Sequence, residues 1–113
     1  VTIGVAPERV AVELRESLES LHYRWTHTPD FTPRHLGIAV HADAVRIHPF
    51  VDGNGRTTRL LADLVFIAAQ DDAPLLGFDW NVDKPQYIAI LRRYDQTRDA
   101  SELADFIPTV AIT

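Results

Sequence analysis

The chain has 113 residues, a formal net charge of −5 and no cysteine. This length suits one domain with a substantial core, and a chain without cysteine cannot form disulfides or thiolate metal sites. The acidic balance argues against a general binder of nucleic acids or membrane surfaces, and no apolar run is long enough to span a membrane.

The N-terminal part predicts a strand and then a helix. Residues 1–5 are apolar at every second position, so we expect a short strand there, the remnant of a β-hairpin. Because the chain starts without methionine, we also expect it to be a fragment of a longer protein. Pro7 suits the first turn of a helix. The helix after it carries a stripe of large apolar residues that we expect to face the core: Val10, Leu14, Leu18, Leu21 and Trp25.

A loop over 28–33 leads to a second helix, which Thr32 can cap and Pro33 can begin. Residues 36–47 are apolar nearly all round this helix. Such a pattern is typical of a central, buried helix.

Pro49 and Gly53 interrupt the helical pattern, and a third helix is expected from near residue 55 to about residue 70. Residues 71–77 read as a loop. Asp83 and Ser101 can each cap a further helix. We therefore predict an all-α fold, with the N-terminal hairpin remnant as the main exception.

The segment between the second and third helices, residues 48–59, reads HPFVDGNGRTTR. It combines a histidine, a carboxylate, two glycines around an asparagine, and two arginines three positions apart. Glycines let the backbone approach an anion closely, and the arginines fall on one face of a helix. A site that handles phosphate needs this collection of base, metal ligand, backbone donors and positive charge.

The segment resembles the motif HPFx(D/E)GNGRxxR of the Fic (filamentation induced by cAMP) family, and every defined position matches. The resemblance extends over roughly residues 30–107, with His41 seven residues before His48, two leucines after Arg59, and the pair Tyr87 and Leu91. It implies a Fic-type helical bundle, a single domain over residues 1–113 with its core at 30–107, in which the motif is the loop between two central helices.

The resemblance also implies a function. The expected activity is that of a protein adenylyltransferase, which transfers AMP from ATP to a Ser, Thr or Tyr hydroxyl of a target protein and releases pyrophosphate. Such a hydroxyl is a weak nucleophile at neutral pH and needs a base. His48 is the candidate, since the unperturbed imidazole pKa is about 6.5. The alternative is a histidine that caps its own helix.

Asp52 is the only carboxylate of the segment. Mg²⁺ commonly binds one or two carboxylates together with phosphate oxygens and water. We therefore expect Asp52 to hold a Mg²⁺ that bridges the α- and β-phosphates. An Asx turn, or a cap for the third helix, is the alternative.

Gly53, Asn54 and Gly55 are expected to direct backbone N–H groups into one anion site at the start of a helix. The Asn54 side chain can add a donor to an α-phosphate oxygen. A plain turn is the alternative, but a turn does not account for the arginines. Arg56 and Arg59 lie in the first helical turn, where cations oppose the helix dipole. We assign Arg56 to the α- and β-phosphates and Arg59 to the γ-phosphate; an ion pair with a surface acid is the alternative for Arg59.

Three signals lie outside the motif. Tyr87 matches a family position that lines the nucleoside pocket, whereas Asp95 falls where relatives often carry Asn. His41 and His48 would share a helix face; we favour a packed His41 with one hydrogen bond over a metal site of two histidines. The remaining histidines are expected on the surface or in loops: His22, His27 and His35.

The family also contains an inhibitory helix with the motif (S/T)xxxE(G/N). Residues 101–105 end in Asp105 where that motif needs Glu, so we expect no such helix in this chain. It would lie upstream, lie in a separate antitoxin, or be absent altogether. The implied partners are ATP and a target protein with a hydroxyl side chain, not nucleic acid or a membrane. The implied location is cytoplasmic, as a toxin at home or an effector delivered into another cell.

Other functions stay open. Kinase-like relatives that transfer the γ-phosphate carry Lys in place of the second motif glycine, so Gly55 argues against that class. A donor other than ATP, such as UTP or a CDP-alcohol, fits the same motif. A nucleotide-binding or interaction module without catalysis is the alternative of a different class. The presence of every polar motif residue argues against it.

Overall fold

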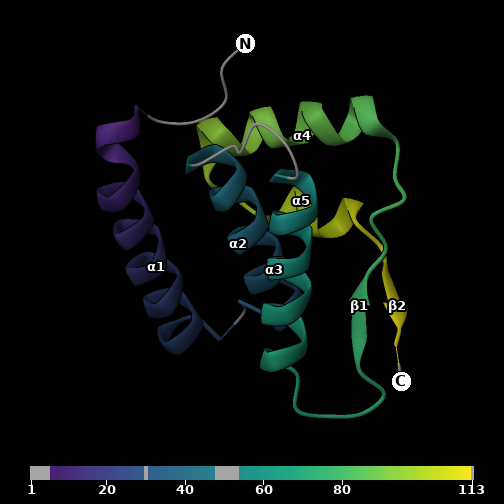
Figure 1. Cartoon of the computed structure of the whole chain (residues 1–113). Coiled ribbons are helices and arrows are strands. Elements are labelled where there is room, and N and C mark those ends of the chain that lie inside the picture. The colour runs from purple at the N-terminus through teal and green to yellow at the C-terminus, as the bar shows by residue number, and fades with distance from the viewer. Residues whose placement is uncertain (1–5, 30, 48–53, 113) are drawn as a thin grey trace.

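A computed structural model of the protein describes residues 6–29, 31–47 and 54–112, and most of these residues are helical (Figure 1). The elements in chain order are a 3₁₀ turn η1 (Pro7–Arg9), α1 (Val10–His27), α2 (Pro33–Ile47), α3 (Asn54–Ala69), β1 (Leu76–Phe78), α4 (Lys84–Thr97), α5 (Ser101–Phe106) and β2 (Thr109–Ala111). The predicted all-α class is confirmed. None of the described helices has the length and apolar character needed to cross a membrane.

Local capping explains where two of the described helices begin. The Asp83 carboxylate accepts a hydrogen bond from the backbone N–H three residues later at 3.0 Å, as predicted for the cap of α4. Thr32 does the same at 3.2 Å, and Pro33 is the first residue of α2. The prediction that Ser101 caps α5 is wrong. Ser101 is the first residue of that helix, and its N–H donates to Asp99.

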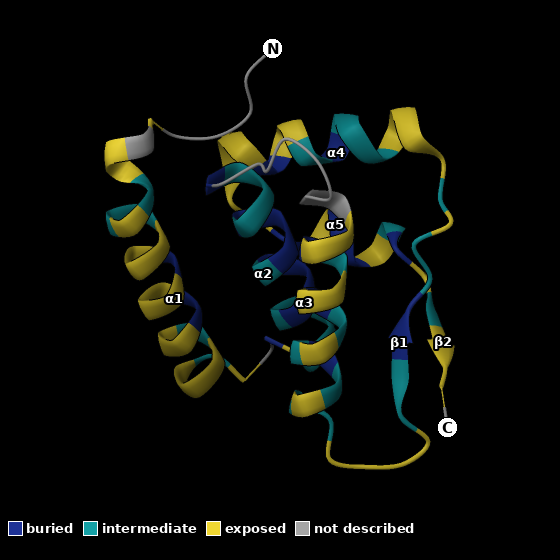
Figure 2. Cartoon of the chain, viewed as in Figure 1, coloured by how far each residue is buried: buried dark blue, intermediate teal, exposed yellow. Residues whose placement is uncertain are grey.

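Helix α2 runs through the centre of the molecule, and Figure 2 shows only buried and half-buried residues along it. Ile38 and Ala39 are fully buried. The close packing of α2 on α3 depends on Gly37, because a Cβ there would lie 3.0 Å from the carbonyl oxygen of Ala62 and 3.1 Å from Cβ of Phe66. The predicted central, buried helix is therefore confirmed.

Helix α1 uses only part of its apolar stripe. Leu21 is buried, but Leu14, Leu18 and Trp25 are 45%, 56% and 38% exposed. The prediction that the whole stripe faces the core is therefore wrong. The reason is geometric: among the described elements, α1 contacts only α2 and η1, so one narrow edge of it is covered.

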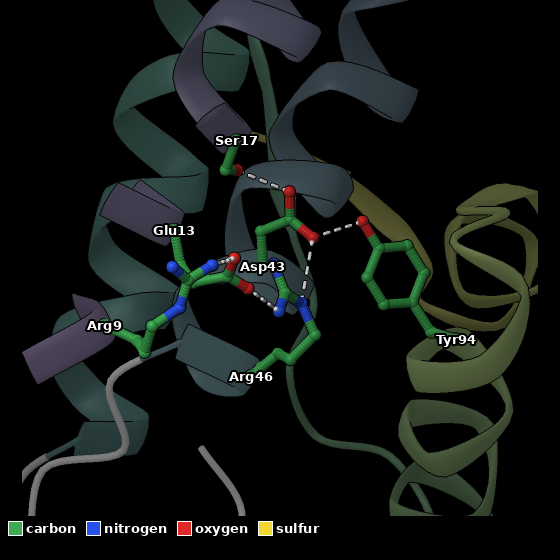
Figure 3. A network of polar contacts seen from close by, with 6 residues as sticks. All are labelled: Arg9, Glu13, Ser17, Asp43, Arg46 and Tyr94. Carbon is green, nitrogen blue, oxygen red and sulfur yellow. Dashed lines mark hydrogen bonds and ion pairs between the residues drawn. The ribbon is translucent and has the colours of Figure 1, made fainter. Parts of the chain in front are cut away.

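That edge is polar as well as apolar (Figure 3). The buried Asp43 carboxylate on α2 accepts hydrogen bonds at 2.5 Å from Ser17 on α1 and from the hydroxyl of Tyr94 on α4. Burial and the Asp43 charge raise the pKa of Tyr94, so its hydroxyl stays protonated and can donate. Beside them, Arg46 donates to Glu13 at 3.0 Å. This cluster joins three helices.

Strands β1 and β2 pair antiparallel, with Leu76 opposite Ala111 and Phe78 opposite Thr109. They lie beside α3, away from α1 (Figure 1). The sequence reading missed both strands and placed residues 71–77 in a loop, although β1 includes residues 76 and 77. The hairpin remnant predicted at residues 1–5 lies outside the described residues.

Candidate active site

The motif joins the two most closely packed helices. Helix α2 ends at Ile47 and α3 begins at Asn54, and both of these ends lie at the same end of the bundle, beside α4 (Figure 1). His48, Asp52 and Gly53 fall outside the described residues. Asn54 and Gly55 are the first two residues of α3, in the place expected for an anion site at a helix N-terminus.

The two motif arginines follow within the next turn and a half of α3. Arg56 is exposed and Arg59 is half-buried. The first turn of α3 holds no acidic residue. Within the described ranges, no ion pair joins either arginine to a carboxylate. The alternative of a surface ion pair for Arg59 therefore finds no partner there.

Arg59 and Tyr87 line one small pocket of about 50 Å³, although they lie on different helices. Its other lining residues are Trp80, Val82 and Lys84, from the segment that leads into α4 and from its first turn. Two residues that the sequence singled out are thus brought together. Burial raises the pKa of the Tyr87 hydroxyl to about 12, while the Arg59 charge acts in the opposite direction.

Trp80, Val82 and Lys84 were missed by the sequence reading. For Lys84 a signal exists, because it lies three residues before Tyr87 and therefore on the same side of α4. Trp80 is held by a residue of α3. Its indole N–H donates to the Asp63 carboxylate at 3.1 Å, and the other oxygen of Asp63 accepts the N–H of Phe78 at 3.0 Å. Asp63 thus ties the strand and the pocket wall to the helix that carries Arg59.

His41 lies behind the pocket wall. It is fully buried, and its Nε2 lies 2.5 Å from the Tyr87 hydroxyl oxygen, within hydrogen-bond distance. The predicted packed, hydrogen-bonded His41 is confirmed. Burial lowers the pKa of His41 to about 4; the backbone of Thr58 opposes that shift, and the Arg59 charge adds to it. Imidazole is therefore neutral here at pH 7.

The remaining candidates lie elsewhere. His22 and His27 are exposed, as predicted, whereas His35 is half-buried in the first turn of α2. Asp95 is exposed and lines a different small pocket, between α2 and α4. Among the described residues, no group of three or more acidic or histidine side chains could hold a metal ion.

Comparisons with known proteins point to one family. A family model described as Fic/DOC matches residues 2–66, which is more than half of the chain. Protein adenylyltransferase fic-1 of Caenorhabditis elegans is 40% identical over 63 residues, which are 56% of this chain and 12% of that protein. A Fido domain-containing protein of Dictyostelium discoideum is 43% identical over 68 residues, covering 53% of this chain and 43% of its own.

Protein adenylyltransferase Fic of Drosophila melanogaster is 43% identical over 49 residues, 41% of this chain and 10% of that protein. The chain therefore spans less than half the length of each of these relatives. No solved structure matches it.

Proposed function

Because the chain belongs to the Fic/DOC family, we propose that it is a protein adenylyltransferase that transfers AMP from ATP to a Ser, Thr or Tyr hydroxyl of another protein. The observation that carries the proposal is the pocket shared by Arg59, the last residue of the motif, and Tyr87 of α4. A cation on α3 and an aromatic ring on α4 that line one pocket suit the phosphate and nucleoside parts of one ligand.

The chemical step needs one base and a stabilised leaving group. His48 takes the proton of the target hydroxyl, and the hydroxyl oxygen attacks the α-phosphorus of ATP. The bond from the α-phosphorus to the bridging oxygen breaks, and pyrophosphate leaves with that oxygen. The products are an AMP–protein phosphodiester and pyrophosphate. The imidazolium that forms on His48 returns its proton to water or to the leaving group.

Charge on the phosphates is met by the start of α3. The backbone N–H groups of residues 53–55 can bind the α-phosphate, as donors at a helix N-terminus. Arg56 would contact the α- and β-phosphates and Arg59 the γ-phosphate, each able to form two parallel hydrogen bonds. Such fixed donors are the main contribution that a protein makes to phosphoryl transfer.

Asp52 would hold the Mg²⁺ that accompanies ATP. One carboxylate is enough for this ion, because phosphate oxygens and water supply its other ligands. When bound, Mg²⁺ neutralises charge on the phosphates.

The test is a nucleotide panel read by intact mass. The protein and candidate acceptor proteins are incubated with Mg²⁺ and ATP, UTP or a CDP-alcohol, and the mass added to any protein identifies the transferred group. We expect added AMP with ATP, and no addition for His48→Ala. His22→Ala is the matched control, because His22 is an exposed histidine on α1.

Four results would contradict the proposal. Added phosphate would indicate a kinase-like relative, and added UMP or an alcohol phosphate would indicate another donor. Addition of AMP by His48→Ala at the wild-type rate would rule out His48 as the base. Binding of ATP without any transfer, across many acceptors, would favour the module without catalysis.

A further inference from the structure

The buried histidine of α2 is not used by the chemistry above. His41 has no exposed surface and does not line the pocket of Arg59 and Tyr87. It lies seven residues before His48, about two helical turns from the motif. A residue in this place cannot touch a nucleotide in the pocket, so any effect on the pocket must pass through a neighbour.

The neighbour is Tyr87, which comes from α4, 46 residues further along the chain. Tyr87 lines the pocket, and its hydroxyl oxygen lies 2.5 Å from Nε2 of His41. Trp80, which also lines the pocket, has its ring centre 4.7 Å from that of His41. The histidine thus contacts two of the residues that line the pocket.

The polarity of the hydrogen bond follows from the charge states. Both partners are neutral near pH 7, because burial disfavours imidazolium and phenolate alike. A phenol is the stronger donor of the two, and a neutral imidazole nitrogen is the stronger acceptor. The Tyr87 hydroxyl can therefore donate to the neutral Nε2 of His41.

We propose that His41 is a positioning residue: it fixes the ring of Tyr87 beside Arg59 and thereby sets the affinity of the pocket for its nucleotide. This inference rests on the proposed function, since it takes the pocket as the nucleotide site. A tyrosine held at its hydroxyl has its χ angles fixed before the ligand arrives, so less side-chain freedom is lost on binding.

Two amide variants of His41 separate the effect of its hydrogen bond to Tyr87 from the effect of its size. In His41→Gln the amide reaches the place of Nε2, so a partner for the Tyr87 hydroxyl is kept. In His41→Asn the shorter amide reaches only the place of Nδ1, and that partner is lost. Both variants bury a neutral amide, so they are matched in polarity. Tyr87→Phe removes the other half of the hydrogen bond.

The measurement is the dissociation constant of Mg²⁺-ATP by calorimetry, with the midpoint of thermal unfolding recorded for each variant. We expect His41→Asn and Tyr87→Phe each to weaken binding about five- to tenfold, the loss of roughly one hydrogen bond. We expect His41→Gln to stay within about twofold of the wild type. In the double variant His41→Asn with Tyr87→Phe the losses should not add, because both remove one interaction.

Two outcomes overturn the inference while the proposed function stands: the wild type binds ATP but the two losses add, or affinity simply follows the unfolding midpoint, with Gln and Asn alike. In either case His41 is a structural residue only. Failure of the wild type itself to bind ATP is a different result. It overturns the proposed nucleotide site and with it the inference.

Discussion

At the scale of single residues, the motif arginines lie near the helix end that least favours positive charge. Arg56 and Arg59 follow the N-terminus of α3, whose first turn contains no acid. The helix dipole disfavours a cation there by roughly 0.3–1 kcal/mol. A phosphate group would reverse this disadvantage, because it brings negative charge to both arginines and to the helix end. Residues that break a local rule in this way are expected at functional or strained sites.

The buried imidazole of His41 should make the free energy of unfolding depend on pH. Its pKa is about 4 in the folded chain and about 6.5 in the unfolded chain. Above pH 6.5 both states are neutral and the residue costs nothing. As the pH falls from 6.5 to 4, the unfolded chain binds a proton that the folded chain does not. The free energy of unfolding should therefore decrease by roughly 3 kcal/mol from this residue.

Urea denaturation at several pH values between 7 and 4 measures this decrease. His41→Gln is the control, because glutamine does not titrate and the difference between the two proteins isolates one residue. Parallel stability curves for the wild type and His41→Gln across this range would contradict the assignment of a buried, neutral imidazole.

At the scale of elements, the packing of α2 on α3 depends on one missing side chain. A Cβ at Gly37 would lie 3.0 Å from the carbonyl oxygen of Ala62, 3.0 Å from Cε2 of Phe78 and 3.1 Å from Cβ of Phe66. Alanine improves helix propensity by about 1 kcal/mol, but these neighbours include the α3 backbone and must all move. We expect Gly37→Ala to lower the free energy of unfolding by about 1 kcal/mol net.

Chemical denaturation of Gly37→Ala beside Gly77→Ala tests this packing. At Gly77 the nearest atom to an added Cβ is Cγ2 of the Ile112 side chain at 3.3 Å, and that side chain can rotate away. We expect little change at Gly77. A stabilised Gly37→Ala would mean that propensity outweighs packing and that α3 yields easily.

The helix starts and the central helix could be predicted from the sequence, whereas the strands could not. Asp83, Thr32 and Pro33 were predictable as helix starts, because capping acts over three or four residues. The apolar pattern of α2 was predictable because a helix covered on all sides has no polar face. Strands β1 and β2 were not, because each is three residues long and is stabilised by pairing with a distant segment.

Some features of the candidate site could likewise be predicted from the sequence, and others could not. The motif could be recognised because its residues are contiguous, and Tyr87 because of the family resemblance. The hydrogen bond from Tyr87 to His41 and the contact of Trp80 with Asp63 join different elements. No local pattern encodes such pairs. The prediction that the whole apolar stripe of α1 faces the core failed for a related reason. Periodicity shows that one face of a helix is apolar, but not how much of that face is covered by another element.

At the scale of the whole molecule, the Asp43 cluster holds α1 to the rest (Figure 3). Ser17 and Leu21 are the buried residues of α1, so its attachment relies on the Ser17–Asp43 hydrogen bond and on the Arg46–Glu13 ion pair. Asp43→Ala removes the common acceptor of Ser17 and Tyr94. We expect the free energy of unfolding to fall by about 3 kcal/mol.

Amide hydrogen exchange gives this prediction its sharper form. In Asp43→Ala the amides of α1 should exchange faster than those of α2 and α3, because α1 loses its link first. Asp95→Ala is the control, an exposed aspartate on α4. Uniformly faster exchange throughout the three helices would contradict the view that the cluster mainly attaches α1.

The proposed transfer of AMP is tested most directly with ATP that carries an isotope label in one phosphate. The protein is incubated with Mg²⁺ and acceptor proteins, once with ATP labelled in the α-phosphate and once with ATP labelled in the γ-phosphate. We expect only the α-label to enter a protein band. We expect His48→Ala to transfer neither label, and His22→Ala to transfer the α-label as the wild type does. Transfer of the γ-label, or α-label transferred undiminished by His48→Ala, would contradict the proposed transfer.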